Sequence, residues 1–78
     1  MARLVFLGRL ADSAGMAEMA VAPGPLEDIL AGLNRDLAIV LLDERVRLAL
    51  NGRLLPQTGA IVLGAGDELA FLPPVSGG

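Results

Sequence analysis

Short apolar runs, separated by glycine, proline and charged residues, recur along the 78-residue chain. Runs of this length that contain β-branched or aromatic residues are typical of strands. The last run is expected to end where Pro73 and Pro74 follow, because proline has no amide proton to donate to a sheet ladder. We therefore predict short strands over residues 3–7, 18–21, 46–50, 53–55 and 68–72.

One segment has the periodicity of an amphipathic helix. Beginning at Pro25, its apolar residues recur three and four positions apart, at Leu26, Ile29, Leu30 and Leu33. Pro25 suits the first position of that helix, and the two acidic residues that follow in its first turn favour a helix start. Residues 9–14 predict one or two further helical turns, which Gly15 would end. The run 37–42 fits either a helical turn or a buried strand.

Turn signals connect these elements. Asn51-Gly52 favours a type I′ turn, because both residues tolerate a positive φ, and it joins two predicted strands into a hairpin. Gly64-Ala65-Gly66-Asp67 predicts a second turn, which leads into the last strand. Earlier in the chain, Pro23-Gly24-Pro25 is expected to close the second strand before the amphipathic helix begins.

The element order, β-β-α-β-β-β, predicts a single α+β domain in which one main helix covers one face of a small mixed sheet. Because side chains alternate across a strand, Leu4 and Phe6 of the first strand point to the same face. Leu69 and Phe71 do the same in the last strand. We expect these four side chains to form the core beneath the helix, together with Leu30.

The opposite face of these two strands is also apolar and carries Leu7 and Leu72, with Leu54 as a weaker third member. In one interpretation both strands are central, and loops or the run 37–42 cover this face. In the other interpretation the face is an apolar patch left for a partner protein, because monomers seldom expose such patches without a reason.

Composition narrows the possible chemistry. Hydrophobic residues make up 54% of the chain and aromatic residues only 3%, so the core is mostly aliphatic. The chain has no Cys and no His, which argues against disulfides, a metal site and a thiol nucleophile. Ser13, Thr58 and Ser76 have no His or Lys to activate their hydroxyls, because all six basic residues are Arg. The sequence argues against an enzyme with catalytic residues of its own.

The charge distribution bears on the class of partner. The net charge is −3 and the Arg residues form no dense run, so no nucleic-acid partner is expected. No apolar run reaches the roughly 18 residues of a membrane span. The amino terminus also lacks the charged, apolar and small-residue pattern of a signal peptide. We therefore expect a cytoplasmic protein that binds neither nucleic acid nor membranes.

The carboxyl-terminal segment is the most informative about function. Pro73 and Pro74 make a stiff, extended exit from the last strand, because each ring fixes φ near about −65°. The segment Val75-Ser76-Gly77-Gly78 follows, and its last two residues have no side chain. Such an end can enter a channel too narrow for a Cβ, and it leaves the terminal carboxylate unhindered. We expect a domain over residues 1–74 and a flexible tail over residues 75–78.

This ending is similar to that of a known family. Phe71-Leu72-Pro73-Pro74-Val75-Ser76-Gly77-Gly78, preceded by Gly66-Asp67-Glu68-Leu69, resembles the end of the small subunits of molybdopterin synthase, which are MoaD-like, ubiquitin-like β-grasp sulfur carriers. The first strand, Gly15 and Ala49-Leu50-Asn51 also resemble that family, whereas residues 16–44 match only in pattern. Family members often carry aromatic residues where this chain has Leu7 and Leu72, so a flatter docking patch is expected here. Some also place an Arg near Ala11, for which Arg9 could substitute.

The resemblance implies a sulfur-donating subunit and not a catalyst. A ubiquitin-activating-like adenylyltransferase would use ATP to adenylate the Gly78 carboxylate, and sulfur would then replace an oxygen to give a thiocarboxylate. Gly77, Ser76 and Val75 would thread into the large synthase subunit, where the sulfur passes to a cyclic pyranopterin monophosphate. No bound cofactor or metal is implied. The large subunit would bind on Leu7, Leu54, Leu72, Pro73 and Pro74.

Other functions are compatible with the same residues. A thiamine-pathway sulfur carrier shares the fold, the Gly-Gly end and the adenylation step, although the Pro73-Pro74-Val75 lead-in favours the molybdopterin branch. A ubiquitin-like protein modifier would join Gly78 to lysines of target proteins. Because this chain has no Lys, it could not form side-chain-linked polymers on itself. An interaction module with an inert tail is the third alternative.

Overall fold

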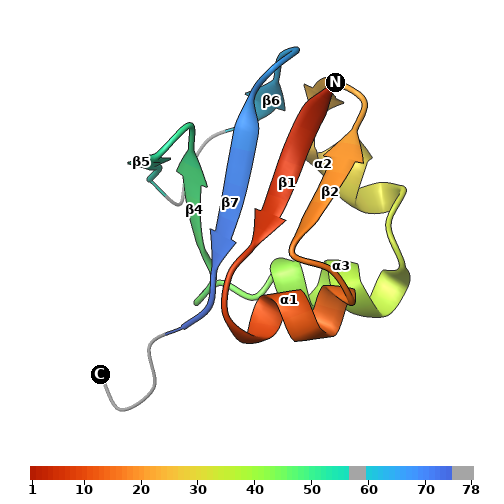
Figure 1. Cartoon of the computed structure of the whole chain (residues 1–78), viewed down its shortest axis with the longest axis vertical. Helices are drawn as coiled ribbons and strands as arrows, with labels where there is room; N and C mark the ends of the chain where they lie inside the picture. Colours follow the sequence, from red (N-terminus) through yellow and green to blue (C-terminus); the bar gives the residue numbers. More distant parts are fainter. Residues whose placement is uncertain (57–59, 75–78) are drawn as a thin grey trace.

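The computed structural model describes residues 1–56 and 60–74. Its strands are β1 (Ala2–Phe6), β2 (Glu18–Val21), β3 (Gly24–Pro25), β4 (Arg47–Leu50), β5 (Arg53–Leu54), β6 (Val62–Leu63) and β7 (Glu68–Leu72). Its helices are α1 (Arg9–Ala14), α2 (Leu26–Ala31) and α3 (Arg35–Leu41). One mixed sheet has the order β2-β1-β7-β4-β5 (Figure 1). β3 and β6 form a separate pair.

The predicted strands are confirmed to within one residue at each end. The central strands β1 and β7 run parallel, although one begins the described chain and the other ends it. β2 pairs antiparallel with β1, and β4 pairs antiparallel with both β7 and β5. The central position of β1 and β7 places neighbours on both of their edges, so their apolar side chains project only to the two faces of the sheet.

The predicted core is also confirmed. Leu4, Phe6, Leu69 and Phe71 are each at most 2% exposed, and Leu30 of α2 packs in the same cluster. The Phe6 and Phe71 rings stack with centroids 5.7 Å apart and an interplanar angle of 20°. The remaining buried members are aliphatic: Ala2, Leu10, Leu26, Leu37, Leu41, Val46 and Leu63. The first and last strands, β1 and β7, therefore contact each other through one aromatic pair inside an otherwise aliphatic core.

The amphipathic segment forms α2, with a correction at each end. The helix begins at Leu26, and Pro25 is its N-cap with an extended ψ of 137°, so Pro25 is not the first helical residue. The helix ends at Ala31, before Gly32, and Leu33 lies beyond it. Glycine is a poor helix former, which accounts for an end earlier than the apolar spacing predicts.

The ambiguous run 37–42 lies mostly within a further helix, α3. Asn34 starts this helix, because its side-chain oxygen accepts hydrogen bonds from the amides of Asp36 at 2.9 Å and Leu37 at 3.4 Å. Leu37 and Leu41 are four positions apart, so they lie on one side of the helix, and both are buried. The interpretation of this run as a buried strand is wrong.

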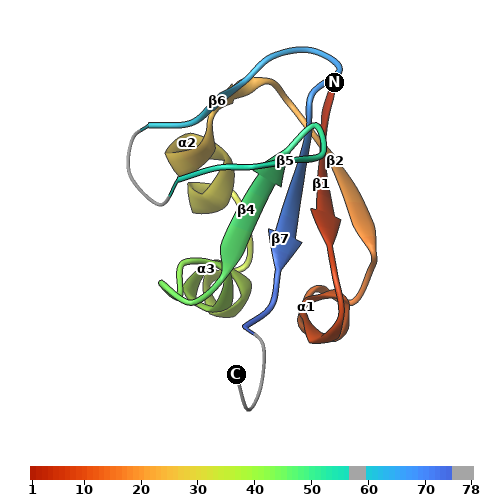
Figure 2. The ribbon, with the colours of Figure 1, turned by 90° about the vertical axis from the view of Figure 1, so that its left-hand side faces the viewer.

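The predicted α+β fold, a mixed sheet covered by helix on one face, is confirmed, and α2 and α3 share the cover of that face. Both lie on the same side of the sheet and contribute leucines to its core (Figure 2). The short helix α1 lies at one end of the sheet, below β1 in Figure 1, and buries Leu10. Within the described residues no helix lies on the opposite face of the sheet.

A second, small sheet joins β3, whose residues were predicted only as part of a turn, to β6, for which no element was predicted. β3 pairs antiparallel with β6, and the Leu26 amide donates a hydrogen bond to the Ile61 carbonyl oxygen at 2.8 Å. Strands of two residues are too short for a hydrophobic alternation to indicate them. This pair fastens the start of α2 to the segment that leads into β7.

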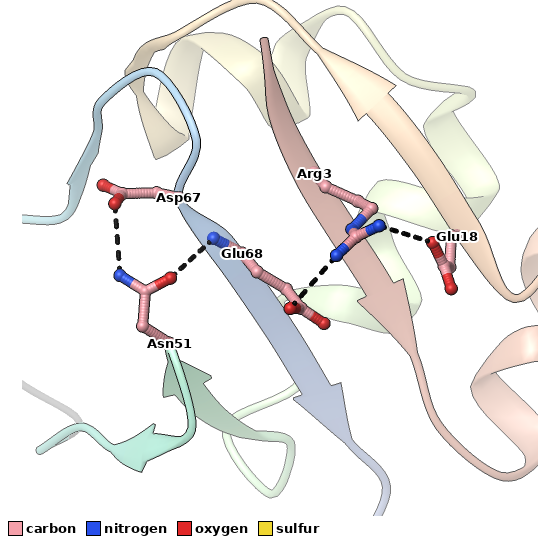
Figure 3. Close-up of polar contacts among 5 residues, drawn as sticks. All are labelled: Arg3, Glu18, Asn51, Asp67 and Glu68. Carbon is pink, nitrogen blue, oxygen red and sulfur yellow. Dashed lines mark hydrogen bonds and ion pairs between the residues drawn. The ribbon is translucent and has the colours of Figure 1, made fainter.

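The two predicted turns are joined to each other at the start of β7. Asn51 and Gly52 have φ values of 51° and 85°, as a type I′ turn requires. Asn51 Oδ1 accepts a hydrogen bond from the Glu68 amide at 2.9 Å, and Asn51 Nδ2 donates one to Asp67 Oδ1 at 3.1 Å (Figure 3). Asp67 Oδ2 accepts a further hydrogen bond from the Gly64 amide at 2.8 Å. One side chain thus links both turns.

Candidate functional site

The candidate site lies where β7 ends. Pro73 and Pro74 follow Leu72 directly and are half-buried, at the end of the sheet where α1 lies (Figure 1). The predicted tail residues Val75, Ser76, Gly77 and Gly78 lie outside the described residues. The site in the described chain therefore consists of the surface that surrounds the start of this tail.

Leu7 and Leu72 lie next to each other on the open face of the sheet. β1 and β7 pair Phe6 with Phe71, so Leu7 and Leu72 are the next residues along each strand and point away from the core. The Leu7 amide donates a hydrogen bond to the Phe71 carbonyl oxygen at 3.1 Å, which continues the pairing beyond β1. Leu7 is 41% exposed and Leu72 is half-buried.

Leu54 joins this surface through two small residues. The strand registers place Leu54, Ala49, Ala70 and Val5 in one row across β5, β4, β7 and β1, all on the open face. Leu54 is 57% exposed. Because the middle of the row is alanine, the surface is flat. We define the open-face patch as Val5, Leu7, Ala49, Leu54, Ala70 and Leu72.

Charged residues border the open-face patch. Arg47 pairs with Leu72 across β4 and β7, so it stands on the same face beside the start of the tail. At the other border Arg3 contacts Glu18 at 3.2 Å and Glu68 at 3.3 Å (Figure 3). These ion pairs are about half exposed, so each contributes little to stability. They mark where the apolar surface ends.

The two interpretations of the second sheet face can now be compared. The run 37–42 does not cover that face, because Leu37 and Leu41 belong to the core on the opposite side of the sheet. Val5 and Ala70, at the centre of the patch, are only half-buried. Within the described residues the face is open, as the interpretation of a partner-binding patch expects. Binding of a partner by these residues stays a prediction.

Two aspartates are held in the ionised form by neighbouring donors. Arg45 donates from its side chain and backbone to Asp43 and lowers the pKa of that carboxyl to about 2. The same contact raises the pKa of the Arg45 guanidinium. The Gly64 amide and the Asn51 side chain lower the pKa of Asp67. Both carboxylates therefore act as hydrogen-bond acceptors that hold loops in place.

A hollow of about 630 Å³ lies on the core side of the sheet, between α2, the end of α3 and β4. Its lining is mostly aliphatic, and its charged members are Glu27, Asp43 and Glu44.

Among residues 1–56 and 60–74 no three His, Cys, Asp or Glu side chains gather as a metal site. None of the helices in those ranges is long and apolar enough to cross a membrane.

Two contacts with the start of the tail have no counterpart in the sequence predictions. The Arg9 side chain donates a hydrogen bond to the Pro74 carbonyl oxygen at 3.2 Å. Gly8 lies against the ring of Pro73. The sequence placed Arg9 at the start of a short helix and, through the family resemblance, as a substitute for an Arg near Ala11, with no link to Pro74. No local signal links residues that are 65 positions apart.

Comparisons with known proteins agree with this architecture. The ThiS family matches residues 4–78. No curated protein matches the sequence significantly. Among solved structures, SAMP1 from Haloferax volcanii has a TM-score of 0.69 and 29% sequence identity, over 99% of this chain and 98% of that protein.

Two further structures share the fold at lower identity. Urm1 from Sulfolobus solfataricus has a TM-score of 0.68 and 17% identity, over 91% of this chain and 97% of that one. A complex of subunits 1 and 2 of the molybdopterin-converting factor from Helicobacter pylori 26695 has a matching chain with a TM-score of 0.66 and 23% identity, over 99% of this chain and 97% of that one. These likenesses confirm the ubiquitin-like β-grasp fold. With a family match that runs from Leu4 through Gly78, this chain belongs to the ThiS family of ubiquitin-like sulfur carriers.

Proposed function

We propose that this chain is the small, sulfur-donating subunit of a molybdopterin synthase. An adenylyltransferase of the ubiquitin-activating type activates the Gly78 carboxylate, which then becomes a thiocarboxylate. The large synthase subunit binds the open-face patch and receives the tail. The thiocarboxylate sulfur passes there to a cyclic pyranopterin monophosphate and becomes part of the dithiolene of molybdopterin.

The observation that carries this proposal is the position of the patch relative to the tail. Leu7 and Leu72 lie on the open face at the end of the strands from which Pro73 and Pro74 lead toward Gly78. A partner seated on these leucines would have Pro73 and Pro74, from which the tail begins, directly beside its contact surface. The family match, which extends through Gly78, and the fold shared with the molybdopterin-converting factor chain add support.

The chemistry requires little of this chain beyond an accessible carboxylate. A Gly78 carboxylate oxygen attacks the α-phosphorus of ATP, and pyrophosphate leaves. A sulfur nucleophile at the oxidation level of sulfide then attacks the carbonyl carbon. AMP leaves and takes with it the former carboxylate oxygen that is bound to its phosphorus. Since the chain has neither Cys nor His, the terminal carbonyl is the group on which it can carry sulfur. Gly77 adds no Cβ that would obstruct a narrow channel.

The test is a mass measurement on the intact chain. Incubation with the activating enzyme, ATP and a sulfur source should add the mass of one sulfur-for-oxygen exchange, confined to the last peptide. Deletion of Gly78, or addition of one residue after it, should eliminate this exchange and molybdopterin formation without loss of folding. Circular dichroism on the same variants supplies the control for folding.

The outcomes separate the alternatives. A thiocarboxylate that supports thiazole formation but not dithiolene formation would assign the chain to the thiamine pathway. An isopeptide bond between Gly78 and a target lysine would assign it to protein modification. If no exchange appears with competent enzymes of either sulfur-carrier pathway, and no conjugate forms, the tail is inert and the proposal is wrong.

A further inference from the structure

Two residues outside the open-face patch contact the start of the tail: Gly8, which precedes α1, and Arg9, the first residue of α1. Arg9 Nη2 donates a hydrogen bond to the Pro74 carbonyl oxygen at 3.2 Å. A Cβ built on Gly8 would stand 3.1 Å from Pro73 Cγ, so Gly8 leaves just enough space for that ring. Two consecutive residues thus contact the last two described residues before the tail.

The backbone of Gly8 makes this arrangement possible. Gly8 has φ 55° and ψ −135°, a conformation that is accessible to glycine and strained for residues with a Cβ. It turns the chain from β1 into α1 immediately after Leu7, whose amide is still bonded to the Phe71 carbonyl oxygen. Arg9 therefore emerges beside the end of β7, within reach of Pro74.

The contact acts on the one backbone angle that proline leaves free. The ring of Pro74 fixes its φ, so rotation about ψ decides the direction in which the chain continues. That same rotation sets the orientation of the Pro74 carbonyl oxygen. A donor that holds this oxygen therefore favours one ψ at Pro74, the last residue before the predicted tail.

We propose that Arg9 is a positioning residue for the carboxyl-terminal tail. Gly8 leaves space for the Pro73 ring, and Arg9 holds the Pro74 carbonyl oxygen. Together they orient the start of the tail before a partner binds. The activating enzyme and the large subunit then bind a chain whose Pro74 is already held, so less conformational freedom is lost on binding. This inference rests on the proposed function and adds a specific residue to it.

The experiment compares three variants with the wild-type chain. Arg9→Met keeps the length of the side chain and removes its donors, whereas Arg9→Lys restores a cationic donor. Arg35→Met is the matched control, because Arg35 opens α3 and makes no hydrogen bond or ion pair with residues 72–74. The carbonyl-carbon NMR resonance of Pro74 is measured in each isolated chain. KM and kcat are then measured for ATP-dependent adenylation by the activating enzyme.

We expect Arg9→Met to shift the Pro74 resonance and to raise KM about threefold to tenfold, which corresponds to the loss of one exposed hydrogen bond. The kcat and the melting temperature should stay at the wild-type values. Arg9→Lys should recover part of the KM, and Arg35→Met should behave as wild type. A merely structural role for Arg9 would lower the melting temperature and would not change KM selectively.

Each contrary result has a distinct meaning. If the wild-type chain is adenylated and Arg9→Met leaves KM unchanged, the positioning role is wrong while the proposed function stands. A raised KM with an unshifted Pro74 resonance would mean that Arg9 contacts the enzyme directly, which also overturns the inference. If no competent enzyme adenylates the wild-type chain, the proposed function fails. The Pro74 resonance then decides alone whether Arg9 holds the tail.

Discussion

Among single residues, Phe71 has the largest expected effect on stability. Its ring is 1% exposed and stacks on Phe6, so its removal leaves a cavity between the two central strands. Phe71→Ala should lower the free energy of unfolding by about 3–5 kcal/mol. Denaturant unfolding followed by circular dichroism measures this change, with Phe71→Leu as a control that retains most of the volume.

The size of that loss matters because small domains have little stability to lose. The net stability of a domain is typically about 5–15 kcal/mol. Phe71→Ala should therefore bring the chain close to unfolding at moderate temperature, whereas Phe71→Leu should remain folded. An unchanged melting temperature for Phe71→Ala would contradict the core assignment.

Asn51 combines a backbone role and a side-chain role that can be separated. Its φ of 51° favours Asn or Gly, and its side chain bonds the Glu68 amide and Asp67. Asn51→Gly keeps the backbone preference and loses the side-chain hydrogen bonds, whereas Asn51→Ala loses both. We expect a loss of about 1–2 kcal/mol for Asn51→Gly and a larger loss for Asn51→Ala, measured by denaturant unfolding. Equal stabilities of the two variants would show that the φ of this position costs nothing.

At the level of elements, β7 presents one face to the core and the other to the solvent. Leu69 is fully buried, whereas Leu72, three positions on, belongs to the open-face patch and is half-buried. Leu72→Asp should abolish binding to the large synthase subunit and leave the fold largely intact, because it places a charge in a desolvated interface. Calorimetric titration measures the binding.

The matched control for that prediction is the same substitution on the opposite face of the same strand. Leu69→Asp should unfold the chain, because it buries a carboxylate without a partner. Loss of the fold in Leu72→Asp as well would assign Leu72 to the core and contradict the docking patch. Full binding by a folded Leu72→Asp would place the interface elsewhere.

For the whole molecule, the two aspartates at turns govern the response to acid. A carboxyl with a lower pKa in the folded chain than in the unfolded chain stabilises the fold while it is ionised. For Asp43 this contribution is complete above its ordinary pKa of 3.8, and it is lost as the pH falls through about 2. Asp67 acts in the same direction, because its pKa is also lowered.

The free energy of unfolding should therefore fall as the pH is lowered below about 4. In Asp43→Asn and in Asp67→Asn this decrease should be smaller than in the wild-type chain. Asp12→Asn controls for the loss of one acidic residue, because Asp12 makes no side-chain hydrogen bond or ion pair in the described residues. Thermal unfolding between pH 2 and 7 provides the measurement, with the range set by the lowered pKa of about 2. If both variants keep the wild-type slope, the donors around these carboxylates do not affect folding.

The sequence alone was sufficient for features that depend on neighbouring residues. The alternation of side chains in 3–7 and 68–72 identified which residues share a face, because strand geometry fixes which residues point the same way. Asn51-Gly52 identified its turn, since few residues tolerate a positive φ. The ending Pro73-Pro74-Val75-Ser76-Gly77-Gly78 likewise indicated the sulfur-carrier family, because a motif of consecutive residues is visible without the fold.

Only the tertiary structure decided what depends on residues far apart in the chain. The run 37–42 is helical and packs on the core side, and a short apolar run does not reveal which surface it will meet. The pairing of β3 with β6 and the contact of Arg9 with Pro74 likewise join distant segments. The open face exists because α2 and α3 both pack on the other face of the sheet (Figure 2). Local periodicity identifies apolar faces, but the packing of whole elements determines which of them stays exposed.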